Sequence, residues 1–302
     1  MTDNHEDRQA TTRRNVLTGG LLAGGAAALL MGAATTPSVA QAADGESILD
    51  KAVRTKKLMV GASLKYPPNM FLNADGKPDG YEIEVMRRML GDITPDLEVE
   101  FVDMDFGQMF PAVETGRVDL MTMGTILPSR ALRGWFAGCA GAFQPVYVVS
   151  KGGTAAVTQE QMNTPEFKFA TLQGSSQEAK IKSLYPNAQL AVFPDQAAAL
   201  GEVMTGRANA TLQSLFTIVN SKKQGVDIAL LNDAPAYVDH NTYFLPAGDI
   251  KLYHYVTTWL LHNAAGGELN SLFRKHIGAD AIAAGLPYMA VGPGGAPITY
   301  TA

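Results

Sequence analysis

The stretch Asp105–Arg130 reads DFGQMFPAVETGRVDLMTMGTILPSR, and it decides how the chain folds. Its first part has apolar residues at helical spacing that can share one face, namely Phe106, Met109, Phe110 and Val113. Gly116 stands where a glycine commonly follows a helix, because that position favours a left-handed backbone. The stretch therefore predicts a helix that ends just before Gly116.

A buried strand and a polar loop are predicted after that helix. Val118–Met123 is a short apolar run rich in β-forming residues, and Gly124 is expected to end it. The loop beyond carries the hydroxyl of Thr125 and the guanidinium of Arg130, whose planar fork of donors matches a carboxylate. The pattern fits an anion site, and it fits equally well a surface arginine in an ordinary salt bridge.

The residues before this stretch predict two more strands with helices between them. Lys57–Ala62 reads as a strand after a helix over Ile48–Thr55, and Leu97–Val102 reads as the next strand. Strands that alternate with helices pair in parallel, which predicts an α/β fold with the ligand beyond the carboxyl ends of the strands. Ser63 and Tyr66 follow the first of these ends and are candidate binding residues.

A later stretch repeats the local order of the first. Glu202–Ser214 contains Thr205-Gly206-Arg207, which lies 90 residues after Thr115-Gly116-Arg117. Each triplet follows a helical pattern and leads into a predicted short strand. The repeat predicts two lobes that are built alike.

The second lobe has its own candidate anion site. Phe167–Leu172 reads as a strand, and the small-residue loop Gln173–Gln177 opens a helix. Such a loop exposes backbone N–H groups at the positive end of a helix dipole. Ser176 is expected to bind a carboxylate oxygen there, and the compatible alternative is a plain serine N-cap.

The N-terminal residues 1–42 are predicted to be a cleaved export signal. Arg13-Arg14 form a twin-arginine pattern before the weakly apolar, glycine-rich run Val16–Ala34, and Ala40-Gln41-Ala42 is a small-residue cleavage site. An ordinary secretion signal and an uncleaved anchor are the alternatives. The prediction places the mature protein in the periplasm.

Composition excludes several classes of function. The chain of 302 residues has a net charge of −5, which argues against nucleic acid or an anionic membrane as partner. The single Cys139 excludes an internal disulfide. The histidines have no metal-ligand spacing, and no phosphate-binding glycine loop or nucleophile motif is present, so no metal and no cofactor are expected.

The residues Met123-Gly124-Thr125-Ile126-Leu127-Pro128-Ser129-Arg130 resemble the G-x-T-x-T-x-x-R motif of the family-3 periplasmic solute-binding proteins, which serve amino-acid ABC importers. The resemblance extends from about Ile48 to about Gly278. It implies that Arg130 binds a ligand carboxylate and that Thr125 binds the ligand as well. It also implies that Tyr66 and Phe106 form opposite walls of the pocket, although each is also a plausible core residue when taken singly.

The resemblance also implies the architecture and the partners. A type II periplasmic binding protein fold has two lobes joined by two hinge strands, with the ligand cleft between them. The expected division is residues 43–144 plus 241–302 for lobe 1 and residues 145–240 for lobe 2. The implied function is capture of a small carboxylate-bearing solute, amino-acid-like or an organic acid, for the membrane permease of an ABC importer. A monomer is expected.

Two departures from the family pattern bear on the ligand. Members that bind α-amino acids have an aspartate facing the ligand ammonium where this chain has Ser214, and Leu127 replaces the second threonine of the motif. A neutral hydroxyl does not offset a buried ammonium as a carboxylate does. Unless another acid such as Asp239 or Glu82 reaches the site, the expected ligand lacks a primary α-ammonium.

Two other functions remain open from the sequence. The segment Thr242–Pro246, together with Trp259, resembles the cyclohexadienyl dehydratases, which are enzymes on the same fold. Thr217 stands where they have a catalytic glutamate. Without that acid the general acid chemistry has no obvious residue, so binding is favoured over catalysis. An exported accessory or sensor protein is the third reading. The Gly/Pro-rich tail from Gly292 is expected to be loosely held.

Overall fold

The computed structural model describes residues 45–301. The predicted export signal, residues 1–42, lies outside the described residues. Among the helices of the described part, none combines the length and the apolar character that crossing a membrane requires.

The first part of the fold is a parallel sheet of order β5-β1-β6 with helices against it. The predicted helices and strands are confirmed here, with α1, β1 and α3 close to their expected bounds. The elements of this part are α1 (Ile48–Thr55), β1 (Lys57–Ala62), β2 (Lys65–Tyr66), β3 (Met70–Leu72), β4 (Pro78–Asp79), α2 (Tyr81–Gly91), β5 (Glu98–Asp103), α3 (Phe106–Glu114), β6 (Leu120–Met121), β7 (Met123–Thr125), α4 (Pro128–Ala131) and β8 (Trp135–Phe136).

Two local predictions in this part were wrong. Gly124 does not end a strand but lies inside β7, where it is paired with Thr242. A Cβ atom at Gly124 would come within 3.0 Å of the Phe110 ring, so glycine permits the close approach of strand and helix. Arg130 lies in the one-turn helix α4 and not in an open loop, because Pro128 starts a helical turn.

The second part contains a mixed sheet of order β11-β10-β12-β9-β14-β7. Strands β10, β11 and β12 pair in parallel, as the alternation of strands and helices predicted. The elements of this part are β9 (Ala142–Lys151), α5 (Gln159–Met162), β10 (Lys168–Leu172), α6 (Ser176–Leu184), β11 (Gln189–Phe193), α7 (Gln196–Met204), β12 (Ala210–Ser214), α8 (Leu215–Lys223), β13 (Ile228–Leu230) and β14 (Tyr237–Leu245).

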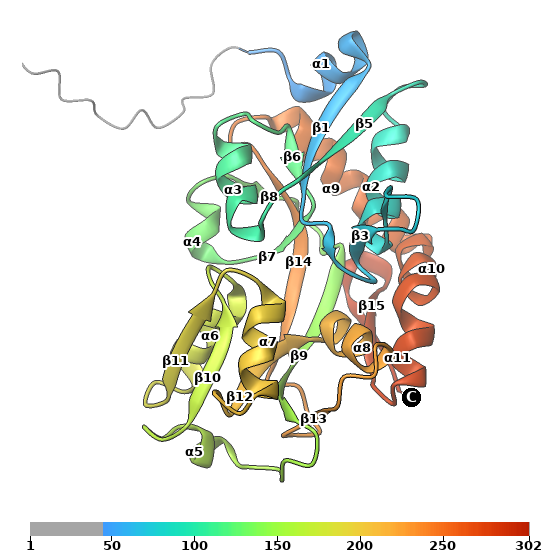
Figure 1. The fold of residues 1–302 in the computed structure, drawn as a ribbon. Helices are drawn as coiled ribbons and strands as arrows, with labels where there is room; N and C mark the ends of the chain where they lie inside the picture. The colour runs from blue at the N-terminus through green and yellow to red at the C-terminus, as the bar shows by residue number, and fades with distance from the viewer. Residues whose placement is uncertain (1–44, 302) are drawn as a thin grey trace, which may run out of the picture. The chain divides into compact units, whose positions relative to one another are not determined.

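Two long strands join the two parts. Strands β9 and β14 pair antiparallel and run side by side between the upper and lower groups of elements in Figure 1. Successive side chains of a strand point to opposite faces, so Asp239 and Asn241 share one face of β14 while His240 lies on the other. The result is a two-lobed α/β fold with two connecting strands.

The C-terminal segment is ordered, which corrects the expectation of a loose tail. Tyr300 stacks on Tyr288 with ring centroids 4.9 Å apart, and its hydroxyl accepts a hydrogen bond of 2.8 Å from Asn270 Nδ2. The glycines and Pro293 form the turn of a hairpin. The elements here are α9 (Ile250–Ala265), α10 (Glu268–Phe273), a π-helical turn (Arg274–Gly278), α11 (Ala279–Ala283), β15 (Tyr288–Val291), a 3-10 turn (Pro293–Gly295) and β16 (Pro297–Tyr300).

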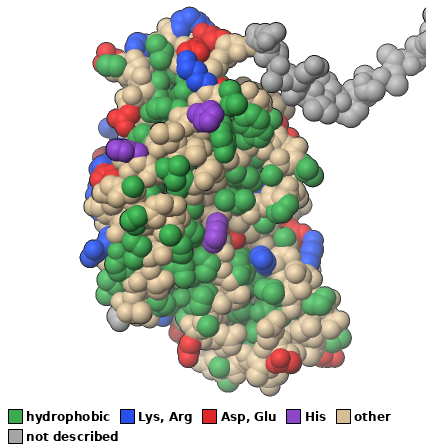
Figure 2. All heavy atoms as spheres, turned by 180° about the vertical axis from the view of Figure 1, so that it is seen from behind, with side chains coloured by type: hydrophobic (Ala, Val, Ile, Leu, Met, Phe, Trp, Pro, Cys, Tyr) green, Lys and Arg blue, Asp and Glu red, His purple; other side chains and the backbone are tan. Residues whose placement is uncertain are grey.

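The largest hydrophobic core runs through both lobes. It includes Val85 of α2, Tyr147 of β9, Ile218 of α8 and Phe273 of α10. Helix α11 lies against α8, so the C-terminal segment contacts the second lobe as well as the first. The lobe boundaries predicted from the sequence stay a prediction. On the face seen in Figure 2, hydrophobic side chains gather in the middle and most charged side chains lie toward the rim.

Candidate ligand-binding site

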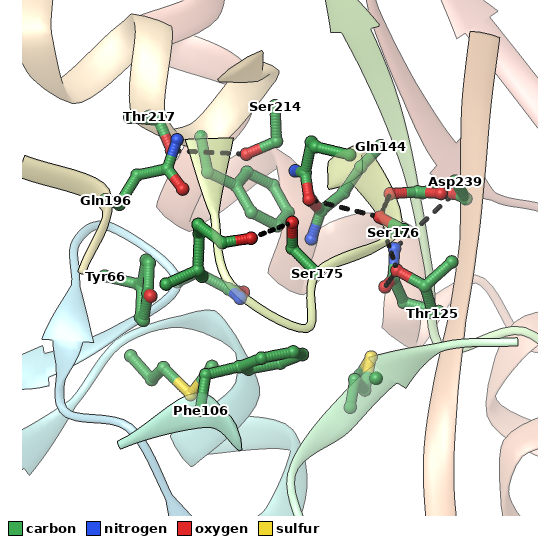
Figure 3. A pocket seen from close by; sticks show the side chains of 18 of the residues that line it. Tyr66, Phe106, Thr125, Gln144, Ser175, Ser176, Gln196, Ser214, Thr217 and Asp239 are labelled. Carbon is green, nitrogen blue, oxygen red and sulfur yellow. Dashed lines mark hydrogen bonds between the residues drawn. The ribbon is translucent and has the colours of Figure 1, made fainter. Parts of the chain in front are cut away.

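A pocket opens where elements of both lobes meet the connecting strands β9 and β14 (Figure 3). It has about 90 Å³ of space open to the centre of a water molecule. Its walls are a mixture of aromatic rings, hydroxyls, amides and two carboxyl groups. The lining residues are Tyr66, Pro67, Asn69, Met70, Glu82, Phe106, Met123, Gly124, Thr125, Gln144, Leu172, Ser175, Ser176, Gln177, Gln196, Ser214, Phe216, Thr217, Asp239 and Asn241.

Five of the seven candidate binding residues line this pocket. They are the aromatic pair Tyr66 and Phe106 and the three hydroxyl residues Thr125, Ser176 and Ser214. The aromatic residues come from the first lobe, and two of the hydroxyls come from the second. Residues predicted separately from four segments of the sequence therefore lie around one cavity.

Arg130 and Ser63 are not among the lining residues. Arg130 is 7% exposed and donates hydrogen bonds to the backbone carbonyls of Thr125 at 2.8 Å and Gly174 at 3.0 Å. Its guanidinium also lies over the Phe110 ring, 4.4 Å from the centroid. Burial lowers the pKa of Arg130 to about 10, while the charge of Asp239 acts in the opposite direction. Arg130 thus ties β7 to the loop of the second lobe. Ser63 is 2% exposed.

The two serines at the start of α6 have different roles. Ser175 is the N-cap, since its Oγ accepts a hydrogen bond of 3.2 Å from Glu178 N. Ser176 is therefore not the capping residue, and its Oγ donates to Asp239 Oδ2 at 2.6 Å. The cap and the pocket hydroxyl, which the sequence left as compatible roles of Ser176, belong to adjacent residues.

Hydroxyl groups from both lobes surround Asp239. Thr125 Oγ1 lies 3.4 Å from Ser176 Oγ and donates to Asn241 Oδ1 at 3.1 Å. Asp239 itself is 4% exposed. Burial raises the pKa of the Asp239 carboxyl, and hydrogen bonds from Ser176 and Thr125 and the charge of Arg130 oppose the rise. An acid that the sequence named as a possible replacement therefore reaches the pocket.

Glu82, the other acid named from the sequence, is held by the protein itself. Its Oε1 accepts a hydrogen bond of 2.5 Å from Asn69 Nδ2, and its Oε2 accepts one of 2.8 Å from Met123 N. Burial raises the pKa of Glu82 to about 8, although these two hydrogen bonds lower it. Burial therefore favours the neutral form of Glu82, and its bond to Met123 joins α2 to β7.

Sequence reasoning missed the amides and one aromatic ring of the pocket. Gln144 and Asn241 reach it from the connecting strands, and Phe216 reaches it from α8. The signal was the alternation along β9 and β14, because Gln144 lies opposite Asp239 in the register. Ser214 Oγ is 3.4 Å from Thr217 Oγ1, so the second lobe presents two neutral hydroxyls here.

The sequence from residue 58 to residue 279 matches the model of the bacterial extracellular solute-binding proteins, family 3. This chain belongs to that family. The two lobes, the two connecting strands and the pocket between the lobes follow the architecture that the resemblance implied.

Named relatives cover different shares of the chain. The amino-acid-binding protein AabA of Dichelobacter nodosus is 28% identical over 58% of this chain and 64% of its own length. The matched region thus spans less than two thirds of AabA. The L-cystine-binding protein TcyJ of Bacillus subtilis is 23% identical over 75% of this chain and 86% of its own length.

Solved structures with the same fold include binding proteins of low sequence identity. The ancestral amino acid-binding protein AncCDT-1, a precursor of cyclohexadienyl dehydratase, superposes with a TM-score of 0.68 at 24% identity, covering 76% of this chain and 100% of that one. The cysteine-binding protein from Campylobacter jejuni superposes with a TM-score of 0.70 at 16% identity, covering 78% of this chain and 94% of that one. These similarities support the type II periplasmic binding protein fold.

Proposed function

We propose that this protein is a periplasmic solute-binding protein that captures a small carboxylate-bearing solute and delivers it to an ABC importer. One observation carries the proposal: Thr125 of the first lobe and Ser176 of the second meet across the pocket with their hydroxyls 3.4 Å apart. A solute held by both hydroxyls would hold the lobes together, which couples binding to the shape that a membrane partner recognises. The names of AabA and TcyJ, both binding proteins for amino acids, support the same reading.

The size of the pocket limits the ligand. The space of about 90 Å³ is several times the roughly 10–15 Å³ that a single water molecule needs. The pocket can therefore admit a small solute such as a small amino acid or organic acid. A titration of the mature protein with the twenty standard amino acids and small organic acids tests the proposal. Absence of binding by all of them would contradict it.

We keep Arg130 as the proposed carboxylate anchor. Its guanidinium contacts Thr125 and Gly174, which adjoin the pocket, so exchange of the Gly174 carbonyl for a ligand oxygen needs only a local shift. Loss of one partner from a buried charged pair costs about 2–5 kcal/mol, so Arg130→Ala should weaken binding about 30-fold or more. Arg133→Ala is the matched control, because Arg133 is exposed and pairs with Glu114. Equal affinities of the two variants would contradict this role.

A dehydratase-like activity is the weaker candidate. Ser214 and Thr217 line the pocket where the dehydratase resemblance requires an aspartate and a glutamate. Their hydroxyls supply no general acid near neutral pH. The buried acids of the pocket, Glu82 and Asp239, come from other elements. Product formation from a cyclohexadienyl substrate by the purified protein would overturn our preference for binding.

The export route follows from the sequence alone and remains a proposal. Arg13-Arg14 before a weakly apolar run favour the twin-arginine route. Changing both arginines to lysine should leave the precursor in the cytoplasm. Arg8→Lys is the control, because Arg8 lies outside the pair. Normal periplasmic yield of the double variant would instead indicate ordinary secretion.

The proposal includes a monomeric state and a membrane permease as partner. We expect a monomer, with lobe 1 as residues 43–144 plus 241–302 and lobe 2 as residues 145–240, that docks on a permease. Light scattering of the purified protein tests the monomer. Loss of solute uptake in a strain that lacks this protein, with permease and ATPase intact, tests the transport role, and unchanged uptake would favour an accessory or sensor protein.

A further inference from the structure

The two buried carboxyl groups of the pocket differ in what surrounds them. Both oxygens of Glu82 accept hydrogen bonds from the protein, one from Asn69 and one from Met123. Asp239 accepts a hydrogen bond of 2.6 Å from Ser176, and its pKa is lowered by hydrogen bonding from Ser176 and Thr125, so its hydrogen-bond donors are hydroxyl groups. A carboxylate has about four acceptor positions, so Asp239 retains capacity for further donors. Of the two acids, Asp239 is the one that is available to a ligand.

Asp239 has no cationic side chain among the described residues in contact with its carboxyl group. Within residues 45–301, no nitrogen of Lys, Arg or His lies within the 4.0 Å that defines a salt bridge to this carboxylate. The charges of Arg130 and Lys180 act on Asp239 only at longer range, and the guanidinium of Arg130 is bonded to the carbonyls of Thr125 and Gly174. A buried carboxylate that lacks a cationic partner is unfavourable. A ligand that brings a cation would remove this penalty.

The surroundings of Asp239 favour a cation. The register places Asp239 opposite Gln144 on the pocket face of the connecting strands. The rings of Tyr66, Phe106 and Phe216 line the same pocket, and aromatic faces attract cations. The neutral residue Ser214, by contrast, belongs to β12, separated from β14 by the intervening strand β9.

We propose that Asp239 pairs with an ammonium group of the ligand, in place of the acid that the chain lacks at Ser214. The proposal rests on the proposed function, because it assumes that a small solute enters this pocket. It assigns the ligand to the class of small amines, with or without a carboxylate at the other end. A plain carboxylate is disfavoured, since it would place a second negative charge near Asp239.

The test compares three sets of probes on the wild-type protein by calorimetry. The first set is small standard amino acids such as alanine, serine, valine and leucine. The second is the corresponding acids without the amine, and the third is the corresponding amines without the carboxylate. We expect the best amino acid to bind at least about 30-fold more tightly than its deaminated acid. This comparison needs no variant.

The second measurement uses Asp239→Asn with Asp233→Asn as control. Both changes remove one negative charge, but Asp233 is exposed in the loop before β14. Asp239→Asn should weaken binding of the best amino acid about 30-fold or more and strengthen binding of the deaminated acid. Asp233→Asn should change neither. A purely structural role of Asp239 would weaken both ligands together, so the opposite changes are diagnostic.

Each outcome separates the two proposals. If deaminated acids bind the wild type as tightly as amino acids, or Asp239→Asn leaves the preference unchanged, the role of Asp239 is refuted and the binding function stands. If amines bind as tightly as amino acids, the role of Asp239 stands and the ligand carboxylate is refuted. If no probe of any set binds, both proposals are refuted.

Discussion

The helix-to-strand connection from α3 to β6 and the connection from α7 to β12 are two copies of one local structure. Gly116 has a φ angle of 70° and Gly206 one of 75°, so both use the left-handed backbone that glycine favours. Thr115 Oγ1 and Thr205 Oγ1 each donate a hydrogen bond of 2.8 Å to a carbonyl one turn back, that of Pro111 and that of Gly201. The predicted structural repeat of the two lobes is present at this level of detail.

The copies continue into the strands and then diverge. Asp119 Oδ2 accepts a hydrogen bond of 2.8 Å from Met59 N, and Asn209 Oδ1 accepts one of 2.7 Å from Lys168 N. Strand β6 pairs in parallel with β1, and β12 pairs in parallel with β10. At the next step, 90 residues apart, Gly124 and Ser214 reach the same pocket. The helix, turn and strand are thus repeated in the two lobes, whereas the residues that follow the repeat differ and line the pocket. Asp239 lies on β14 and belongs to neither copy.

The largest expected effect is a change of stability with pH, and it comes from Glu82, a buried acid that contacts the repeated segment of the first lobe only. Glu82 bonds Met123 N, whose counterpart in the second lobe is Gln213. The pKa of Glu82 is raised from 4.5 to about 8, mainly by burial, so between these values the folded protein holds a proton that the unfolded chain has lost. This contribution to stability is complete below pH 4.5 and is lost as the pH rises to about 8.

The dependence of the free energy of unfolding on pH tests this expected contribution of Glu82. Within that window Glu82 should contribute a decrease of about 1.4 kcal/mol per pH unit. Urea unfolding at several pH values should show this decrease in the wild type and a flatter curve in Glu82→Gln. Glu100→Gln, an exposed acid on β5, should keep the wild-type slope. Identical slopes for wild type and Glu82→Gln would show that Glu82 is ionised in the folded protein.

A smaller difference in stability is expected between substitutions of Asp119 and Asn209, which occupy equivalent positions in the two copies. Asp119 is 8% exposed and also pairs with Lys51 at 2.7 Å, whereas Asn209 is exposed and water can replace its side chain. Asp119→Ala leaves the part-buried N–H of Met59 without its partner and also removes the pair with Lys51, so it should cost about 2–3 kcal/mol, against about 1 kcal/mol for Asn209→Ala. Urea unfolding at pH 7 measures both. Asp119→Asn, which can keep the bond to Met59, should fall between them, and equal losses for both alanine variants would contradict the comparison.

The sequence predicted structure that depends on neighbouring residues better than structure that depends on distant ones. Helix α1 and strand β1 have the bounds that were expected, because caps and periodicity act within a few residues. Gly124 was misread because its role depends on Thr242, a partner far along the chain. The amides of the pocket were missed for the same reason, since the pairing of Gln144 with Asp239 is a long-range register. Local structure was predictable, and contacts set by distant pairing were not.

Equal and moderate losses of stability are expected when either of the two glycines after the helices, Gly116 or Gly206, is replaced. A Cβ atom at Gly116 or Gly206 would meet nothing within 4 Å, so only the backbone strain of a positive φ remains. Changing either glycine to alanine should cost about 1–2 kcal/mol. Gly201→Ala is the control, because Gly201 lies inside α7 with open space around it and should gain about 0.5–1 kcal/mol. A difference of more than about 1 kcal/mol between the two end glycines would break the equivalence of the copies.

The smallest effect is expected at an exposed charged pair of the second copy that the first copy lacks. Arg207 bonds Glu202, but the counterpart of Glu202 in the first lobe is Ala112. The turn is nevertheless the same, since Arg117 N bonds the Ala112 carbonyl as Arg207 N bonds the Glu202 carbonyl, both at 2.9 Å. The backbone bonds and the glycine therefore form the turn, and the exposed ion pair is screened by water and salt. Arg207→Ala should have the same midpoint of thermal unfolding as Arg117→Ala, in low and in high salt. A lower midpoint for Arg207→Ala that disappears in high salt would show instead that the second copy depends on its ion pair.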